Sequence, residues 1–404
     1  MNFFRSLVQP VVKDSPFNKG VIVLLVLIVF AALLATSSPE NMAGFAAAPE
    51  PDEEHIENDI LEYPDQDLLY APEFEEPRFD VPGDIYLLVP DTGIMTYNPL
   101  TGLPMDEARA QNRPLAIVLA NCVDSIPMNG IAQADVVYEL LVEGGITRML
   151  ALYQDFSDVQ MAGSIRSARH YTVEFARSHD AILIHAGGSQ PYAYRTISEL
   201  GVPNLDEVGG NRRDIFFRDR GRIGGRRIDT MHAVVTTNAR VAQFLPQYDF
   251  NLDHTPSFEQ GWFFADDATP VGGTAATNAV VTFPGGKTST FDFDATENVY
   301  RMTQFRRDFV DANDGSRPGF TNVIVMRTSI TSMQGDGAGR QNVVTVGEGE
   351  GYFINGGRSI PINWSRANRE SPLVFTNLDG SPLEFGRGTT YIGVTSIRAD
   401  VTIR

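Results

Sequence analysis

Cysteine is almost absent from the sequence, since Cys122 is the one cysteine among 404 residues. A single cysteine excludes a disulfide bond within the chain and any zinc site built from cysteines. The histidines form no H-x-x-x-H pair, and the arginines near them would repel a cation. We therefore expect neither a metal site nor a cofactor.

Long apolar runs are equally scarce, and the one that is present lies near the N-terminus, from Val21 to Ala35. Cationic residues precede it and an acidic stretch follows it, which is typical of a segment whose N-terminal side stays in the cytoplasm. The sequence thus predicts a cytoplasmic stretch over residues 1–20 and a transmembrane or signal-anchor helix over residues 21–36. The predicted localisation is therefore the cytoplasmic membrane, with a single pass and the bulk of the chain extracytoplasmic.

A cleaved signal peptide fits the same apolar run. Small residues that suit a cleavage site lie between Ala43 and Glu50, although about a dozen residues separate them from the run. No cysteine follows the run, so a lipid cannot be attached there.

Positive charge is also in short supply, with 32 Lys and Arg against 51 Asp and Glu and a net charge of -19. Much of the excess lies between Pro49 and Asp84, a stretch with many acidic residues and one arginine, Arg78. Such a stretch cannot bury enough apolar surface to fold, so residues 37–84 are predicted to be a disordered acidic linker. The acidity of the whole chain argues against binding of nucleic acid.

The remaining residues are numerous enough for two domains and two cores. From residue 85 to about 255, buried strand-like runs occur together with helical spacing, which indicates an α/β (α+β) domain. From about 256 to 404, short β-rich runs are separated by glycine-containing turns without a long helical pattern. We therefore predict an α/β domain over residues 85–255 and a mostly antiparallel β domain over residues 256–404.

A β-hairpin is predicted in the first domain, where Gly144-Gly145 separates two strand-like runs. The alternating pattern points Glu139, Leu141 and Glu143 to the same face. Pairing across a two-residue turn sets Arg148 opposite Leu141 and diagonal to both glutamates.

A helix, a strand and a second helix are predicted after the hairpin. Apolar residues recur at helical spacing from about Ser164 to Ser178, with Arg166 and Arg169 off the apolar stripe in the opening turns. The sequence DAILIHAGGS then indicates a buried strand and a loop, in which Ser189 can cap a second helix that ends at Gly201.

Arg148, Arg166 and Arg169 are thus expected to lie near one another, with glutamates of the hairpin beside them. One interpretation is a purely structural cluster of salt bridges. The other is an anion site, because planar guanidinium groups suit bidentate contact with carboxylate or phosphate.

His185 is predicted at the C-terminal end of its strand, just before a glycine-rich loop and Ser189. Ligands of open α/β sheets bind at that edge, and the exposed amides of a helix start favour anions. An ordinary loop held by a hydrogen-bonded histidine explains the pattern equally well. Catalysis by Ser189 is disfavoured, because the G-x-S-x-G elbow that exposes a nucleophile is missing.

Several motifs together resemble the YerB-like family of bacterial envelope proteins, which are described as lipoproteins with an N-terminal and a C-terminal domain of unknown function. The motifs are NPLTGLP, RPLAIVLAN, QADVVYELLVEGGITRMLALYQ, SIRSAR and DAILIHAGGS, and the second half matches more loosely. The resemblance implies a secreted, membrane-tethered protein of the cell envelope and no established reaction. Where relatives tend to show Arg-Pro-Gln-Ser-Gly and Pro-His-Asn, this chain has Ile126 to Gly130 and Met231 to Ala233.

The leading hypothesis is a membrane-tethered, extracytoplasmic binding or accessory protein that recognises an anionic envelope component or an envelope protein. Its cleft is predicted to be lined by Glu143, Arg148, Arg166, Arg169, His185, Ser189 and His232. The alternative is an envelope hydrolase that acts on peptidoglycan or a phosphoester, with His185 or His232 as general base and Glu143 as acid partner. A third hypothesis is a structural spacer that docks onto other envelope proteins.

Overall fold

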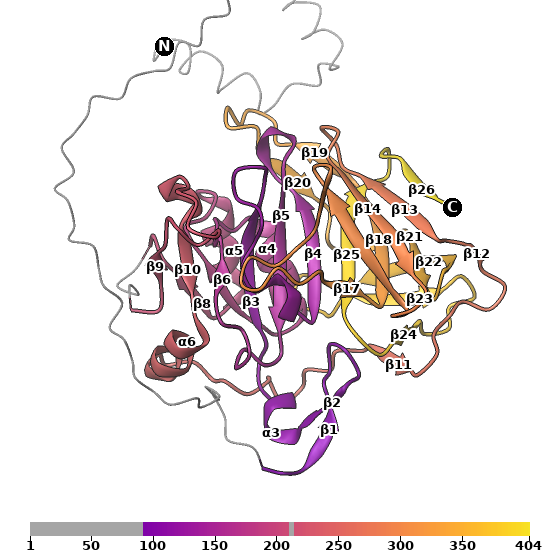
Figure 1. Ribbon diagram of the computed structural model, residues 1–404, viewed down its shortest axis with the longest axis horizontal. Helices are drawn as coiled ribbons and strands as arrows, with labels where there is room; N and C mark the ends of the chain where they lie inside the picture. Colours follow the sequence, from indigo (N-terminus) through magenta and orange to yellow (C-terminus); the bar gives the residue numbers. More distant parts are fainter. Residues whose placement is uncertain (1–91, 210–213) are drawn as a thin grey trace, which may run out of the picture. The chain divides into compact units, whose positions relative to one another are not determined.

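A large mixed β-sheet runs through the computed structural model, which describes residues 92–209 and 214–404 (Figure 1). Its N-terminal strands, in spatial order, are β4 (Val136–Leu141), β5 (Thr147–Tyr153), β3 (Leu115–Asn121), β7 (Ile182–His185) and β8 (Asn204–Asp206). Its C-terminal strands are β12 (Thr274–Ala275), β22 (Arg358–Arg366), β21 (Gly347–Asn355), β18 (Asn322–Thr328) and β25 (Thr390–Ser396), with β23 (Val374–Asn377) also paired to β22.

The two halves of the chain share this sheet, because β25 pairs in parallel with β4 from Thr390 opposite Val136 to Val394 opposite Leu140. A mixed α/β N-terminal region and a mostly antiparallel β C-terminal region are therefore as predicted. The expectation of one core for each half is wrong. Strand β4 lies inside the sheet and needs a partner along each edge, and the second partner comes from the far end of the chain.

Two hydrophobic cores lie on the two faces of the sheet, and each contains residues from both halves. On one face, Ile117 and Met149 belong to the same core as Phe291 and Met302 of a second sheet. That sheet consists of β16 (Arg307–Asp308), β15 (Val299–Gln304), β14 (Thr288–Asp294), β13 (Asn278–Thr282) and β26 (Val401–Ile403), with β17 (Gly319–Phe320) paired to β15.

The opposite face is covered by helices in its N-terminal part. There α4 (His170–Ser178) and α5 (Tyr192–Leu200) pack on strand residues such as Tyr138, whose ring stacks on Phe175 at 4.9 Å between centroids. Further along the same face, Trp262, Trp364 and Phe385 belong to the core. Each large apolar side chain buried in this way contributes roughly 2 kcal/mol.

The remaining elements are short. They are β1 (Met95–Tyr97) with β2 (Pro104–Asp106), β6 (Ala162–Gly163) with β10 (Val234–Thr236) and β9 (Phe217–Arg218), β11 (Phe263–Ala265) with β24 (Glu384–Gly386), β19 (Ile330–Ser332) with β20 (Gln341–Val343), α3 (Glu107–Ala110), α6 (Asn238–Phe244), and the 3-10 turns η2 (Ile131–Gln133), η3 (Glu143–Gly145), η4 (Thr230–His232) and η5 (Leu245–Gln247).

Helix α4 begins at His170, so the prediction of a helix from Ser164 is wrong. The backbone before it is extended because it pairs with β3, with Ile165 opposite Leu119 in an antiparallel bridge. The strand over DAILIHAGGS and the helix that ends at Gly201 are confirmed.

The hairpin is present, but its register differs from the prediction by one residue. Three residues, Glu143–Gly145, form the turn, and Arg148 lies opposite Leu140 instead of Leu141. Because side chains alternate between faces, Arg148 points to the helix-covered face, and the predicted contact with Glu139 is wrong.

No helix in the described part of the chain is long and apolar enough to cross a membrane. The predicted anchor at residues 21–36 lies outside the described residues, as do the cytoplasmic stretch and the acidic linker.

Candidate anion-binding site

The segment from Ser164 to Arg169 runs along the edge of the sheet where parallel strands end. The backbone N–H of Arg166 donates to the Val118 carbonyl at 2.8 Å, and the N–H of Ala186 donates to the Arg166 carbonyl at 3.1 Å. This segment therefore lies between the end of β3 and the loop after β7. Ligands of open α/β sheets bind at such an edge, so the arginines stand where a ligand would be expected.

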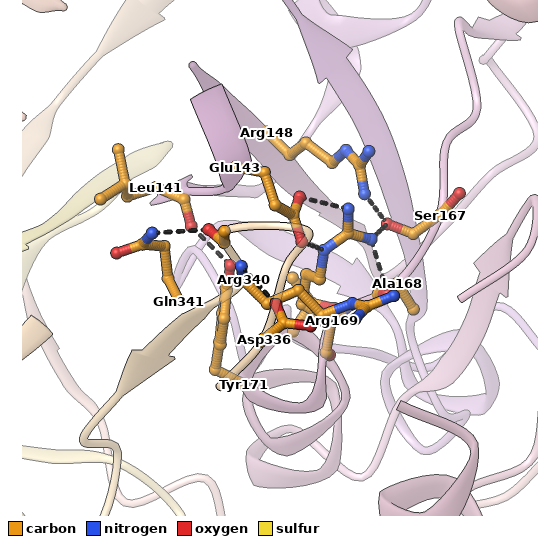
Figure 2. Close-up of polar contacts among 12 residues, drawn as sticks. Leu141, Glu143, Arg148, Ser167, Ala168, Arg169, Tyr171, Asp336, Arg340 and Gln341 are labelled. Carbon is orange, nitrogen blue, oxygen red and sulfur yellow. Dashed lines mark hydrogen bonds and ion pairs between the residues drawn. The ribbon is translucent and has the colours of Figure 1, made fainter. Parts of the chain in front are cut away.

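Arg169 is matched by a carboxylate. Its Nε donates to Glu143 Oε1 at 2.7 Å and its Nη2 to Glu143 Oε2 at 2.5 Å, a bidentate fork drawn in Figure 2. Burial alone would raise the pKa of Glu143, but the hydrogen bonds and charge of Arg169 outweigh burial and lower it. Arg169 is 9% exposed, so loss of its partner Glu143 would leave a buried charge and destabilise the fold.

Arg148 projects from β5 beside this pair and is only 7% exposed. Its Nη1 donates to the Ser167 carbonyl, and in the described part of the chain it forms no ion pair with a carboxylate (Figure 2). Burial, followed by the charges of Arg169 and Arg166, lowers its pKa to about 9. A guanidinium buried beside two others is costly unless negative charge is supplied.

Arg166 is half-buried, and its Nη1 donates to the Met231 carbonyl at 2.6 Å. It too has no carboxylate ion-pair partner among residues 92–209 and 214–404. Burial is the main cause that lowers its pKa, and Arg169 adds to it, while Cys122 and Asp229 act in the opposite direction.

Arg218 extends the cationic surface on the far side of η4. Its Nη1 donates to the Thr230 carbonyl at 2.9 Å, next to the carbonyl that Arg166 holds, and its Nη2 contacts both carboxylate oxygens of Glu207 at 2.8 and 3.0 Å. A hollow of about 500 Å³ is lined by Glu207, Val208, Phe216 and Arg218. Arg218 was not among the predicted site residues, although it lies in an arginine-rich run of the sequence.

His232 comes directly after Met231, whose carbonyl accepts from Arg166, and is 8% exposed. Its Nδ1 is buried without a hydrogen-bond partner in the described structure. Burial, and then the charge of Arg166, lowers the pKa of His232. A buried ring nitrogen without a partner is a group whose hydrogen bond a ligand could complete.

His185 and Ser189 are brought to the same sheet edge but are buried within it. His185 Nδ1 lies 2.8 Å from the Gly187 carbonyl and its Nε2 lies 3.3 Å from Asn204 Oδ1, so each ring nitrogen faces an acceptor oxygen of the protein. Ser189 does not cap α5, since Pro191 holds the N-cap position and the Ser189 hydroxyl is buried without a partner among the described residues. His185 is fully buried and Ser189 is 5% exposed, so these two residues shape the loop more than they line its surface.

Among Arg148, Arg166 and Arg169, only Arg169 forms an ion pair with a carboxylate in the described part of the chain, so the cluster carries an excess of positive charge. Guanidinium forks bind carboxylate and phosphate oxygens, and they provide neither a nucleophile nor a general base. No three His, Cys, Asp or Glu side chains of the described residues are grouped so as to hold a metal ion.

The chain thus has an α/β N-terminal region and a β-rich C-terminal region, and one sheet joins the two. Residues 100–250 match the family described as "Protein of unknown function (DUF3048) N-terminal domain", and residues 279–392 match its C-terminal domain. The chain belongs to this YerB-like family, as its motifs indicated.

A relative from Bacillus subtilis (strain 168), described as "Putative lipoprotein YerB", is 25% identical over 310 residues, which is 76% of this chain and 88% of that protein. The crystal structure of YerB protein from Bacillus subtilis is similar, with a TM-score of 0.64, 23% identity, and coverage of 76% of this chain and 99% of that one. This likeness shows that the fold is shared.

Proposed function

We propose that this protein is an envelope-associated binding or accessory protein that recognises anionic groups through Arg148 and Arg166. Its similarity to a protein described as a lipoprotein supports a place outside the cytoplasmic membrane. The apolar run at residues 21–36 would supply the tether.

One observation carries the proposal: Arg148 and Arg166 hold backbone carbonyls, and the nearby carboxylate, Glu143, is already bound by Arg169. A carbonyl dipole offsets a cation less than a full negative charge does. A phosphate or carboxylate placed between the two guanidinium groups would accept their remaining N–H donors and remove their mutual repulsion.

The hydrolase hypothesis names His185 or His232 as general base, and His185 gives it no support. His185 is fully buried and each of its ring nitrogens faces an acceptor oxygen of the protein, so it is not placed to take a proton from water or substrate. Binding without turnover is the function that this arrangement of side chains favours.

Isothermal titration with pyrophosphate and with citrate tests the proposal. We expect saturable binding to the wild-type protein and binding weaker by about tenfold or more in Arg166→Gln, because a charge-assisted hydrogen bond is lost. Binding should also weaken as salt rises from about 0.05 to 0.5 M.

The matched control is Arg398→Gln, which removes the same charge from an exposed turn after β25, three strands along the sheet from β3. It should bind as the wild-type protein does. Equal affinity in Arg166→Gln and Arg398→Gln, or the absence of binding to either anion, would overturn the proposal.

A further inference from the structure

A second pocket, of about 230 Å³, has none of Arg148, Arg166 and Arg169 in its lining and lies where the loop after β3 meets the hairpin of β15 and β16. Both halves of the chain therefore contribute to its walls. Its lining residues are Ile126, Pro127, Gln304, Arg307, Asp308, Phe309 and Val310.

Gln304 is the unusual member of this lining. Burial alternates along β15, so Gln304 points inward on the same side as Tyr300 and Met302 and is 3% exposed. Neither its Oε1 nor its Nε2 has a hydrogen-bond partner within the described residues. A buried amide without partners destabilises a fold, and such a group calls for an explanation, such as a bound molecule that supplies the missing bonds.

The neighbouring polar groups do not supply them. Ser289 lies opposite Gln304 on β14, but its hydroxyl donates to Glu139 Oε2 at 2.6 Å. Asp308, at the mouth, lies 3.1 Å from an Nη2 of Arg317. The amide of Gln304 thus has no partner within the described residues, in a pocket that Ile126, Pro127, Phe309 and Val310 also line.

A side-chain amide offers an acceptor oxygen and donor hydrogens in one plane. A secondary amide, whose N–H and carbonyl point in opposite directions, can donate its N–H to Oε1 or accept from Nε2 through its carbonyl. The apolar walls from Ile126, Pro127 and Phe309 would surround a methyl group. An acetamido group combines a methyl, a carbonyl and an N–H in this way.

The size of the pocket favours binding of one substituent of a larger ligand over binding of the whole ligand. Pockets for whole small molecules usually exceed about 300 Å³, so this one suits a substituent. Arg307 and Asp308 at the mouth offer donors and acceptors that match the hydroxyls of a sugar ring. We propose that this pocket binds the acetamido group of an N-acetylated amino sugar, with Gln304 as its hydrogen-bonding partner.

Titration of the full chain with tri-N-acetylchitotriose tests this assignment, with the deacetylated trimer and N-acetyl-alanine-N-methylamide as comparison probes. We expect saturable binding of the acetylated trimer, and affinity at least about tenfold lower for the deacetylated trimer and for the blocked amino acid. Because this comparison uses the wild-type protein, it does not depend on the folding of a variant.

Gln304→Met keeps the length of the side chain and removes both polar groups. If the amide is held for a ligand, this variant should lose at least about tenfold in affinity for the acetylated trimer while its melting temperature is equal or higher. Arg166→Gln should bind the trimer like the wild type, which separates this site from the anion site.

Three results would overturn the assignment. They are equal binding of the acetylated and deacetylated trimers, preference for the blocked amino acid, and a lower melting temperature of Gln304→Met with trimer binding unchanged. The last result would identify the amide as a structural group with ordered water as its partner.

Discussion

At the scale of single residues, the chemistry of the sheet edge depends on how few carboxylates it has. Glu143 is bound by Arg169 through two hydrogen bonds, while Arg148 donates to the Ser167 carbonyl and Arg166 to the Met231 carbonyl. The cluster is stable enough to fold and still favours an added negative charge.

Replacing Glu143 by Gln should separate the effect of this carboxylate on stability from its effect on anion binding. Arg169 would lose its counter-charge while remaining buried, so the free energy of unfolding should fall by about 3 kcal/mol. Affinity for pyrophosphate should rise, because a competing carboxylate has been removed. Urea unfolding and calorimetry measure the two effects.

Glu259→Gln, which removes the same charge from an exposed position, is the control and should change neither quantity. A Glu143→Gln protein of wild-type stability and wild-type affinity for pyrophosphate would contradict this account of the cluster.

Most of the cluster could be predicted from the sequence, but its contacts could not. Arg148 and Arg169 come from neighbouring segments, and local periodicity places those segments side by side. The contact of Arg166 with Met231 joins residues 65 positions apart across an irregular loop. Loops of this kind carry no repeating pattern from which such pairing can be inferred.

At the scale of elements, α4 depends on a buried histidine at its C-terminal end. His179 Nε2 lies 2.7 Å from the Tyr138 hydroxyl and its Nδ1 lies 2.9 Å from Gln260 Oε1. The neutral ring, protonated on Nδ1, satisfies both contacts, since the Tyr138 hydroxyl then donates to Nε2. Burial lowers the pKa of His179 to about 3.

This histidine should make the protein sensitive to acid. In the unfolded chain its pKa is about 6.5, so between about pH 6.5 and pH 3 the unfolded state binds a proton that the folded state does not. The contribution of His179 to stability is therefore present above about pH 6.5 and is lost as the pH falls.

His179→Gln removes this titration. Between about pH 7 and pH 4, the difference in unfolding free energy between wild type and variant should move by on the order of 3 kcal/mol in favour of the variant. Urea unfolding at the two pH values measures it. A difference that is the same at both would show that His179 is protonated in the folded protein.

The elements themselves could be predicted where their patterns are local. The strand before the glycine-rich loop and the helix that ends at Gly201 are examples. The helix expected from Ser164 was placed too early, because its first residues are used by β3 as a pairing partner. Tertiary pairing has overridden a helical periodicity there.

At the scale of the whole molecule, a buried ionic network joins the halves of the chain. Glu139 on β4 contacts Lys287, and it accepts hydrogen bonds from Ser289 at 2.6 Å and from the Tyr391 hydroxyl at 2.7 Å. Burial would raise the pKa of Glu139, but the charge of Lys287 outweighs burial and lowers it. Lys287 is the one lysine in the sequence after Lys19.

Lys287→Met should therefore leave a buried carboxylate without its cation and lower the free energy of unfolding by about 3–5 kcal/mol. The double variant Lys287→Met with Glu139→Gln should lose less than the sum of the two single variants. Chemical denaturation followed by circular dichroism measures each value. Additive losses would show that the two residues do not act as a pair.

The union of the two halves could not be predicted from the sequence. The pairing of β25 with β4 links residues more than 250 positions apart, and each strand alone indicates only that it is buried. The predicted two-domain organisation therefore describes the order of secondary structure along the chain, while the packing is shared.

The central claim is that Arg148 and Arg166 bind an anion. The most direct measurement follows the arginine Nε–H resonances in ¹⁵N NMR spectra as pyrophosphate is added. The account predicts saturable shifts for Arg148 and Arg166 and none for Arg398. Small shifts of all arginines that grow without saturation, or saturable shifts confined to arginines away from the sheet edge, would contradict it.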